Sequence, residues 1–359
     1  MAGSGARARR CGSDQPPTGT DRSRPLRVAV RIPLGVPMDE ALSAIELAER
    51  AGFDTISVPE SPTLFRDTFI TLGVAATRTT TATLACTVTS FVSHDPINIA
   101  NSARTLAELA PGRIRIGIGA GDSSAFLTGR KTATTRELRE GFGIVSGLLA
   151  GEVVTVRGTE VHLQDPCGPL PMFLAADGPR NLALAAEIAD GVITWSGELE
   201  RKAAQLTEAQ RAHDRARPLH HVVTTTACVT NDVGRDAWFL KPYIVRFAQR
   251  IGPAKLAELG FDTTLPDDNV VLADGVDLGH PRDLAAAAEF ASRWISDDFA
   301  VWYATNVCCF GTSGEVAAKL RALADYGADE VQVTDGSSFS TPTRLINQMA
   351  AEVIPSLHR

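Results

Sequence analysis

The sequence lacks the features by which several protein classes are recognised. Its 359 residues contain no apolar run long enough for a transmembrane helix. Its six cysteines form no CxxC pair and no Cys/His cluster at zinc spacing, so neither a disulfide framework nor a metal site is indicated. Lys and Arg number 35 against 42 Asp and Glu, which gives no basic excess for nucleic acid. We expect a soluble, cytoplasmic protein that binds neither membrane nor nucleic acid.

Common catalytic signatures are missing as well. The sequence contains no G-x-S-x-G, H-E-x-x-H or P-loop motif, so hydrolase and NTPase activities lack support. The stretch GIGAGD, which begins at Gly117, resembles the dinucleotide fingerprint G-x-G-x-x-G. Its sixth position is Asp122, however, and it follows the fourth predicted strand rather than the first. A nicotinamide site of the Rossmann type is therefore not expected.

The first 25 residues differ in composition from the rest of the chain. Met1 to Pro25 lacks aromatic and branched apolar residues and is rich in Arg, Gly, Ser, Pro and Thr, which predicts a disordered tail. Its Arg9-Arg10 pair is not followed by an apolar stretch, so an export signal is not expected. Residues 26–359 are expected to form a single domain.

Strand and helix patterns alternate along this domain. The predicted strands are 26–32, 53–61, 82–89, 113–119, 171–177, 191–195, 221–230 and 330–334. The predicted helices are 39–51, 67–77, 96–110, 135–149, one from 178, 198–217, 313–326 and 341–356, and a hairpin is predicted at 152–163. Such alternation with apolar strands is typical of an open doubly wound sheet or an eightfold barrel. Because eight strands can be counted, we predict a (β/α) TIM barrel.

The alternation lapses between Asn231 and Asn306. This predicts an insertion of about seventy residues late in the barrel, long enough to form a functional lid or wall. In a barrel of this kind the functional site lies at the carboxyl ends of the strands. The predicted rim residues are Glu60, Ser90, His94, Asp122, Asp177, Trp195 and Ser196.

Two segments at the predicted rim, and the nearby His94, contain candidate catalytic or ligand-binding groups. The strand RIRIGIG runs into a glycine-rich loop that ends in Asp122, a candidate active-site carboxylate, although Asp122 could equally cap the next segment. The segment from Ala176 to Arg180 begins a helix whose free N–H groups could bind a phosphate, or Asp177 could simply be its N-cap. His94, which precedes a predicted helix start at Asp95-Pro96, could donate a proton or help to close that start.

Four segments together resemble the bacterial-luciferase-like superfamily, and within it the enzymes that use the deazaflavin coenzyme F-420, such as methylenetetrahydromethanopterin reductase. These segments are AERAGFDTISVPES, VTSFVSHDPINIANSARTLAELAPGRIRIGIGAGDSS, GPLPMFLAADGPRNLALAAEIADGVIT and GADEVQVT. The resemblance covers residues 26–199 and 313–334. It implies an eightfold barrel that holds a flavin or deazaflavin and forms a homodimer.

The resemblance also implies roles for individual residues. The cofactor ring would lie at the end of the third strand, beside a non-proline cis peptide bond at Thr87–Val88 or one residue earlier, at Cys86–Thr87. Asp122 would exchange a proton near the transferred hydride. A dry barrel mouth would raise the pKa of its carboxyl group for that role, and His94 could assist in the proton exchange. The implied cofactor-binding residues are Glu60, Thr87, Val88, Gly121, Ala176, Gly178, Pro179, Arg180, Trp195 and Ser196.

We therefore predict a deazaflavin-dependent oxidoreductase, specifically a reductase that transfers hydride between coenzyme F-420 and a small organic substrate. One alternative is an FMN-dependent luciferase-like monooxygenase, and another is a non-catalytic flavin-binding protein. The sequence departs from part of the superfamily, because Ser61 stands where its sugar-phosphate dehydrogenases and luciferases have a histidine. This departure counts against both of those activities.

Overall fold

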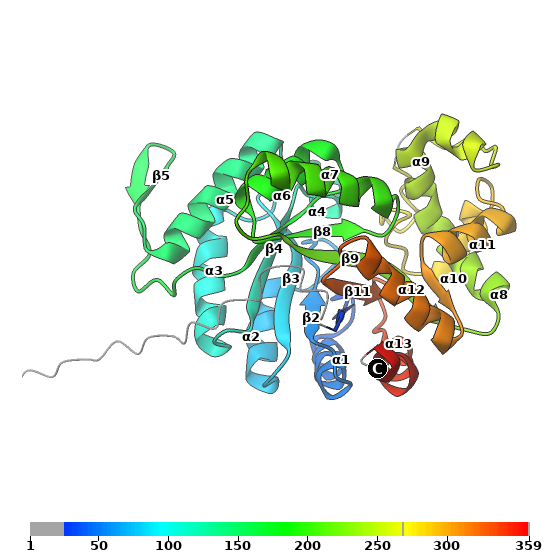
Figure 1. The fold of residues 1–359 in the computed structure, drawn as a ribbon, viewed down its shortest axis with the longest axis horizontal. Coiled ribbons are helices and arrows are strands. Elements are labelled where there is room, and N and C mark those ends of the chain that lie inside the picture. Colours follow the sequence, from blue (N-terminus) through cyan, green and yellow to red (C-terminus); the bar gives the residue numbers. More distant parts are fainter. Residues whose placement is uncertain (1–24, 268, 358–359) are drawn as a thin grey trace, which may run out of the picture.

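The computed structural model describes residues 25–267 and 269–357, and its centre is a closed barrel of parallel strands (Figure 1). The barrel strands are β1 (Arg27–Arg31), β2 (Thr55–Val58), β3 (Thr83–Ser90), β4 (Ile114–Gly119), β7 (Met172–Ala175), β8 (Gly191–Trp195), β9 (His220–Val229) and β11 (Glu330–Thr334). They pair in chain order, β8 pairs with β9, and β11 closes the ring between β9 and β1. The short strand β10 (Cys309–Gly311) adds to β9 outside the ring. The predicted eightfold barrel is confirmed.

Helices lie between the barrel strands and cover the outside of the barrel (Figure 1). They are α1 (Met38–Arg50), α2 (Thr68–Arg78), α3 (Pro96–Leu109), the short α4 (Ser123–Phe126), α5 (Thr135–Ala150), α6 (Pro179–Ile188), α7 (Leu199–Ala212) and α12 (Ser313–Asp325). The chain ends in α13 (Thr343–Gln348), a π-helical turn (Met349–Val353) and α14 (Ile354–Leu357). The predicted helix 198–217 is too long, because the chain leaves α7 through Asp214, which has a positive φ of 44°.

The predicted hairpin is present as β5 (Val154–Val156) and β6 (Thr159–Val161). Residues between β9 and β10 form a group of helices at one side of the barrel, drawn from yellow to orange in Figure 1. These are α8 (Val233–Ala237), a 3-10 turn (Trp238–Leu240), α9 (Lys241–Glu258), α10 (Leu284–Ala291) and α11 (Asp297–Asn306). They share a hydrophobic cluster of their own around Phe247 and Phe299. The division of the chain into domains stays a prediction, and residues 1–24 of the predicted tail lie outside the described residues.

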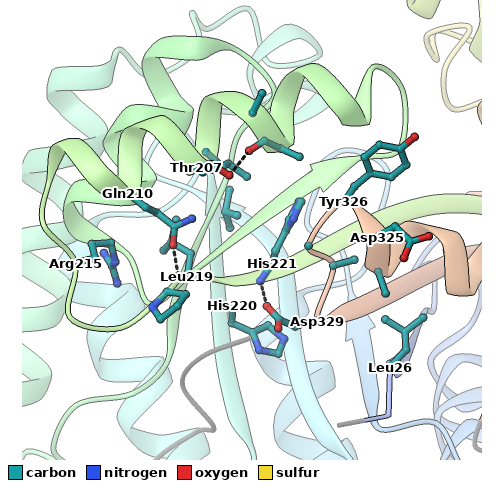
Figure 2. A pocket seen from close by; sticks show the side chains of 18 of the residues that line it. Leu26, Thr207, Gln210, Arg215, Leu219, His220, His221, Asp325, Tyr326 and Asp329 are labelled. Carbon is teal, nitrogen blue, oxygen red and sulfur yellow. Dashed lines mark hydrogen bonds between the residues drawn. The ribbon is translucent and has the colours of Figure 1, made fainter. Parts of the chain in front are cut away.

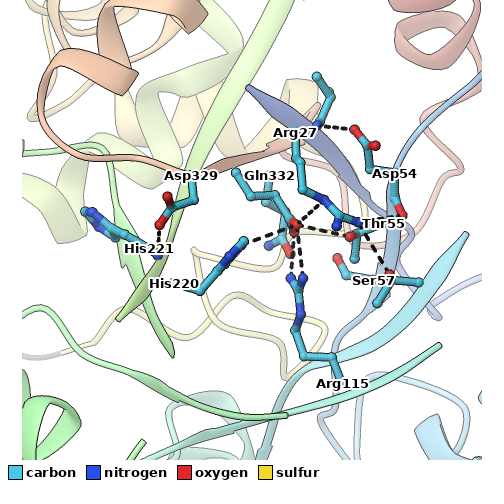
Figure 3. A network of polar contacts seen from close by, with 12 residues as sticks. Arg27, Asp54, Thr55, Ser57, Arg115, His220, His221, Asp329 and Gln332 are labelled. Carbon is cyan, nitrogen blue, oxygen red and sulfur yellow. Dashed lines mark hydrogen bonds and ion pairs between the residues drawn. The ribbon is translucent and has the colours of Figure 1, made fainter. Parts of the chain in front are cut away.

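The amino end of the barrel is filled by a polar network around Glu330, whose side chain is completely buried (Figure 3). Arg115 donates to both carboxylate oxygens, at 2.7 and 3.1 Å, and Thr55 donates at 3.1 Å. Arg27 Nε and His220 Nε2 lie 3.4 and 3.6 Å from the same carboxylate. Burial alone would raise the pKa of Glu330, but Arg115 and His220 hold it well below its usual value. This end of a barrel serves stability rather than catalysis.

Two structural findings bear on the sequence predictions. None of the helices in the described part of the chain has the length and apolar character needed to cross a membrane. Five cysteines are free thiols, and Cys11 lies outside the described residues.

Candidate active site

The carboxyl end of β3 carries an irregularity that shapes the barrel mouth. The Thr87–Val88 peptide bond is cis, at the first of the two predicted positions, and the register between β3 and β4 shifts between Cys86 and Thr89. Val88 packs inside the barrel against a cluster that contains Phe173, Ile193 and Val222. The neighbouring strand β4 leaves room for this bulge with a glycine, because a Cβ added to Gly119 would lie 2.8 Å from Val88 Cγ2.

Gly119→Ala should therefore destabilise the protein. The added methyl group has to displace Val88, and overpacking of this kind costs about 1–3 kcal/mol. The free energy of unfolding, measured by urea denaturation, should fall by that amount. The matched control is Gly143→Ala on the exposed face of α5, where a Cβ meets nothing within 4 Å and the better helix former should stabilise. Equal effects of the two substitutions would contradict the packing argument.

A buried acid and a histidine meet beside this bulge. Glu60 follows β2, and its side chain is 5% exposed. One oxygen, Oε2, accepts a hydrogen bond from the Thr89 hydroxyl and lies 3.2 Å from His94 Nε2. The hydrogen bond to Glu60 raises the pKa of His94, and the edge-on ring of Phe69 covers the imidazole. This pair can hold a proton at near-neutral pH and pass it on.

The second oxygen of Glu60 is unsatisfied. Oε1 is buried and has no hydrogen-bond partner within residues 25–267 and 269–357. Buried carboxylate oxygens in native proteins normally have a partner. Glu60 is therefore ready to accept a hydrogen bond from a bound molecule.

Asp122 lies at the rim but not in the dry setting that the sequence analysis expected. Its side chain is 63% exposed, and Oδ1 accepts a hydrogen bond from Arg246 Nη2 at 2.7 Å. It occupies the N-cap position of α4 without a side-chain capping bond, so the alternative of a simple helix cap finds no support. The preceding Gly121 has a positive φ of 93°, which places the turn in a conformation that glycine adopts readily.

The start of α6 offers backbone donors at the rim. Its N-cap is Gly178, with no side-chain capping bond, and Pro179 and Arg180 are exposed. Asp177 is not the N-cap, contrary to the alternative reading of the sequence. It is instead paired with the buried Lys202, whose pKa is lowered by burial. The helix N-terminus is thus open to an anion.

Other predicted site residues surround this helix start. Ala176 is buried beneath it. The Trp195 backbone N–H donates to Asp177 at 3.1 Å, and Trp195 as a residue is 41% exposed. The Ser196 hydroxyl lies 2.7 Å from the carbonyl oxygen of Val307 and is already engaged. The sequence reasoning missed Lys202, because nothing in the helical pattern of α7 marks this lysine as buried.

Helix α9, which belongs to the predicted insertion, covers the barrel mouth. The sequence predicted the insertion but not the contacts that its helices make with the rim. The Tyr243 hydroxyl donates to the carbonyl oxygen of Gly336, after β11, at 2.6 Å. One turn later along the helix, Arg246 forms an ion pair with Asp122, which follows β4. On the next turn, Arg250 lies 3.2 Å from Asp177, which follows β7. The spacing of these three residues along the sequence is the signal that could have revealed the contact face.

A cavity of about 1160 Å³ lies at the other end of the barrel (Figure 2). It is lined by residues of α7, α12 and the starts of β1 and β9, among them His220 and His221. His221 is buried, and burial lowers its pKa to about 4, so it stays neutral near pH 7. Because the functional end of such a barrel is the carboxyl end, we do not place the active site in this cavity.

Comparison with known proteins now identifies the family. A family model described as luciferase-like monooxygenase matches residues 20–330. The chain belongs to this family. A 5,10-methylenetetrahydromethanopterin reductase of Methanolobus tindarius is 31% identical over 311 residues, which cover 82% of this chain and 91% of that protein. An F-420-dependent glucose-6-phosphate dehydrogenase of Beutenbergia cavernae is 33% identical over 178 residues, 44% of this chain, and the match spans only 53% of that relative.

Solved structures support the fold. The F-420-dependent tetrahydromethanopterin reductase of Methanopyrus kandleri has a TM-score of 0.72 at 17% identity, covering 93% of this chain and all of that chain. An F-420-dependent secondary alcohol dehydrogenase has a TM-score of 0.67 at 15% identity and covers 93% of this chain. The predicted resemblance and the predicted enzyme class, a luciferase-like oxidoreductase, are confirmed by the family and these relatives.

Proposed function

We propose that the chain is a coenzyme F-420-dependent reductase that acts on a small organic substrate. The observation that carries the proposal is the pair formed by the buried Glu60 and the half-buried His94 beside the Thr87–Val88 bulge. The chain also aligns with nearly the full length of a methylenetetrahydromethanopterin reductase. The substrate of that relative is not assigned to this chain. The predicted homodimer and cytoplasmic location stay predictions.

The residues at the mouth fit a deazaflavin. The unsatisfied Oε1 of Glu60 and the orphaned Thr87 hydroxyl are polar atoms that a heteroaromatic ring could satisfy, and Val88 offers an apolar surface. The uncapped start of α6, with Gly178, Pro179 and the guanidinium of Arg180, suits a phosphate. The remaining proposed contacts are Gly121, Ala176, Trp195 and Ser196.

The chain's own residues would manage the proton. The cofactor, when bound, supplies the hydride. His94 holds a proton at Nε2, and the Glu60 carboxylate keeps that proton in place and orients the ring. Asp122, the other proposed proton-handling residue, is paired with Arg246 of helix α9.

Binding of the two candidate cofactors tests the proposal. Purified protein is titrated with coenzyme F-420 and with FMN, and binding is followed by absorbance and fluorescence. Selective binding of coenzyme F-420 is expected. Selective binding of FMN would favour the monooxygenase alternative, which the family model's own description supports. Binding of neither would remove the basis for this site.

Arg180→Gln should weaken binding of coenzyme F-420 about fivefold to tenfold at low ionic strength. The arginine is exposed, so its attraction for a phosphate is modest and should decline with added salt. The matched control is Arg139→Gln, which removes an exposed arginine of α5 that is paired with Glu187. A loss of affinity that does not change with salt, or an equal loss in the control, would contradict a phosphate contact at Arg180.

A further inference from the structure

Arg31 is a charged residue of the barrel mouth that the proposed function leaves unused. It is the last residue of β1 and pairs in register with Ser57 of β2. Residues two apart on a strand face the same side. Arg27, on the same strand face, reaches Glu330 inside the barrel. Arg31 therefore points into the barrel as well, but at the carboxyl end.

The Nε atom of the Arg31 guanidinium has no hydrogen-bond partner among the described residues, and the residue as a whole is half-buried. This Nε atom is buried, and the side chain forms no ion pair with any residue in 25–267 or 269–357. Burial lowers the pKa of this guanidinium, and the nearby Tyr243 and Asp122 oppose that effect only in part. A buried donor atom that lacks a hydrogen-bonding partner destabilises a folded protein.

The groups nearest to Arg31 are already committed to other partners. The Tyr243 hydroxyl donates to the carbonyl oxygen of Gly336 at 2.6 Å. The carboxylate of Asp335 accepts the backbone N–H of Ser337 at 2.9 Å. None of these groups hydrogen-bonds the guanidinium in the described structure. The barrel mouth therefore contains a hydrogen-bond donor, Arg31 Nε, for which the described residues supply no acceptor.

A second arginine lies close by with an exchangeable partner. Arg246 is paired with Asp122, whose side chain is 63% exposed. Exposed ion pairs contribute little to stability, so an incoming anion could replace Asp122 at low cost. Arg31 at the end of β1 and Arg246 on α9 thus both have Asp122 as a charged neighbour, and neither is held by a buried ion pair within the described part of the chain.

We infer that Arg31 binds the anionic group, a carboxylate or a phosphate, of the substrate. The inference rests on the proposed function and narrows its substrate to small organic anions. The planar guanidinium matches both groups through paired hydrogen bonds. The phosphate of the cofactor has a separate proposed site at the start of α6, which leaves Arg31 to the substrate. Arg246 adds a second positive charge from α9.

The test measures anion binding by the full chain, with and without bound coenzyme F-420. Inorganic phosphate and succinate are the two probes, and isothermal titration calorimetry is the readout. The variants are Arg31→Gln, which removes the charge, and Arg31→Lys, which retains it. The control is Arg282→Gln, because Arg282 is an arginine of the same region that already stacks over Phe339, 4.5 Å from the ring centroid.

The loaded wild-type protein should bind at least one probe, and Arg31→Gln should weaken that binding about tenfold to hundredfold. Arg31→Lys should recover part of the affinity, the control should bind as the wild type does, and the affinity for coenzyme F-420 should be unchanged throughout. Absence of probe binding in the wild type, or equal binding in Arg31→Gln, would overturn the inference. A matching loss of coenzyme affinity would show that the anion belongs to the cofactor, which also overturns it.

The unloaded protein separates this inference from the proposed function. If the wild type binds no coenzyme F-420, the proposed function fails, and Arg31-dependent binding of a probe would then show an anion site without that reaction. Thermal unfolding supplies an independent readout. Arg31→Gln should raise the unfolding midpoint of the unloaded chain, because it removes a buried donor atom, Nε, that has no hydrogen-bond partner among the described residues. A lower midpoint would indicate a structural role and contradict the inference.

Discussion

Glu60→Gln should lower the turnover of the coenzyme-loaded enzyme about hundredfold to ten-thousandfold, because His94 loses the carboxylate that orients its ring and keeps its proton in place. Glutamine has nearly the shape of glutamate, so the contact with Thr89 can persist. It lacks the negative charge, however, and the hydrogen bond to the carboxylate is the main cause of the raised pKa of His94. Without that charge His94 should lose its proton at a lower pH.

The pH dependence of turnover should move with the same substitution. If protonated His94 donates the proton, activity falls as pH rises through the pKa of His94 in the loaded enzyme. In Glu60→Gln this fall should occur at lower pH. Titration of the His94 ring by NMR would give the same shift directly. Glu46→Gln, which changes a glutamate of α1 paired with Arg78 at the surface, is the control and should leave turnover unchanged.

The same pair affects stability with a defined sign. The pKa of His94 is raised in the folded protein above its unfolded value, near 6.5. Its contribution to stability is therefore fully present below that unfolded value and is lost as pH rises through the folded value. Replacing Glu60 should therefore make the free energy of unfolding depend less on pH in this range.

A turnover equal to that of the wild type, or an unchanged pH dependence of turnover, would remove Glu60 and His94 from the proposed proton path.

Arg115→Met should reduce the free energy of unfolding by about 3–5 kcal/mol, the usual cost of removing one partner from a buried ion pair. The substitution leaves the completely buried Glu330 carboxylate without both hydrogen bonds that Arg115 donates to it. Arg115 also lies 4.5 Å above the ring of Phe173, so some packing energy is lost as well. Urea denaturation followed by circular dichroism would measure the loss.

A surface arginine provides the control for this experiment. Arg139 forms an ion pair with Glu187 on exposed faces of α5 and α6, and Arg139→Met should change stability by less than about 1 kcal/mol. The double variant with Glu330→Leu should regain part of the stability lost in Arg115→Met, because it removes the uncompensated charge. Similar losses in Arg115→Met and in the control would show that the buried network contributes no more than a surface pair.

The alternation of apolar strands and amphipathic helices was enough to predict the barrel. Each strand is buried on both faces and each helix on one, so these patterns are local and can be read from the sequence. Glu60, His94 and Asp122 could be placed at the rim because each follows a predicted strand. Their partners could not be deduced in this way.

The rest of the site depends on contacts between distant parts of the chain. The buried state of Lys202 and the pairing of Arg246 with Asp122 arise only when α7 and α9 pack against the rim. Arg31 did leave a trace, because in the strand LRVAVRI the two arginines Arg27 and Arg31 share one face among apolar residues. In an eightfold barrel that face points inward, and charges that point inward need either a partner or a ligand.

Helix α9 has a consequence for how new specificities could evolve on this scaffold. Its Tyr243, Arg246 and Arg250 contact the loops after β11, β4 and β7. Because all three loops contact the same helix, a substitution in one loop changes the effect that substitutions in the other two loops have on activity. Changes in these loops should therefore be epistatic. Directed evolution would reach a new substrate sooner by varying α9 together with the loops than by varying each loop alone.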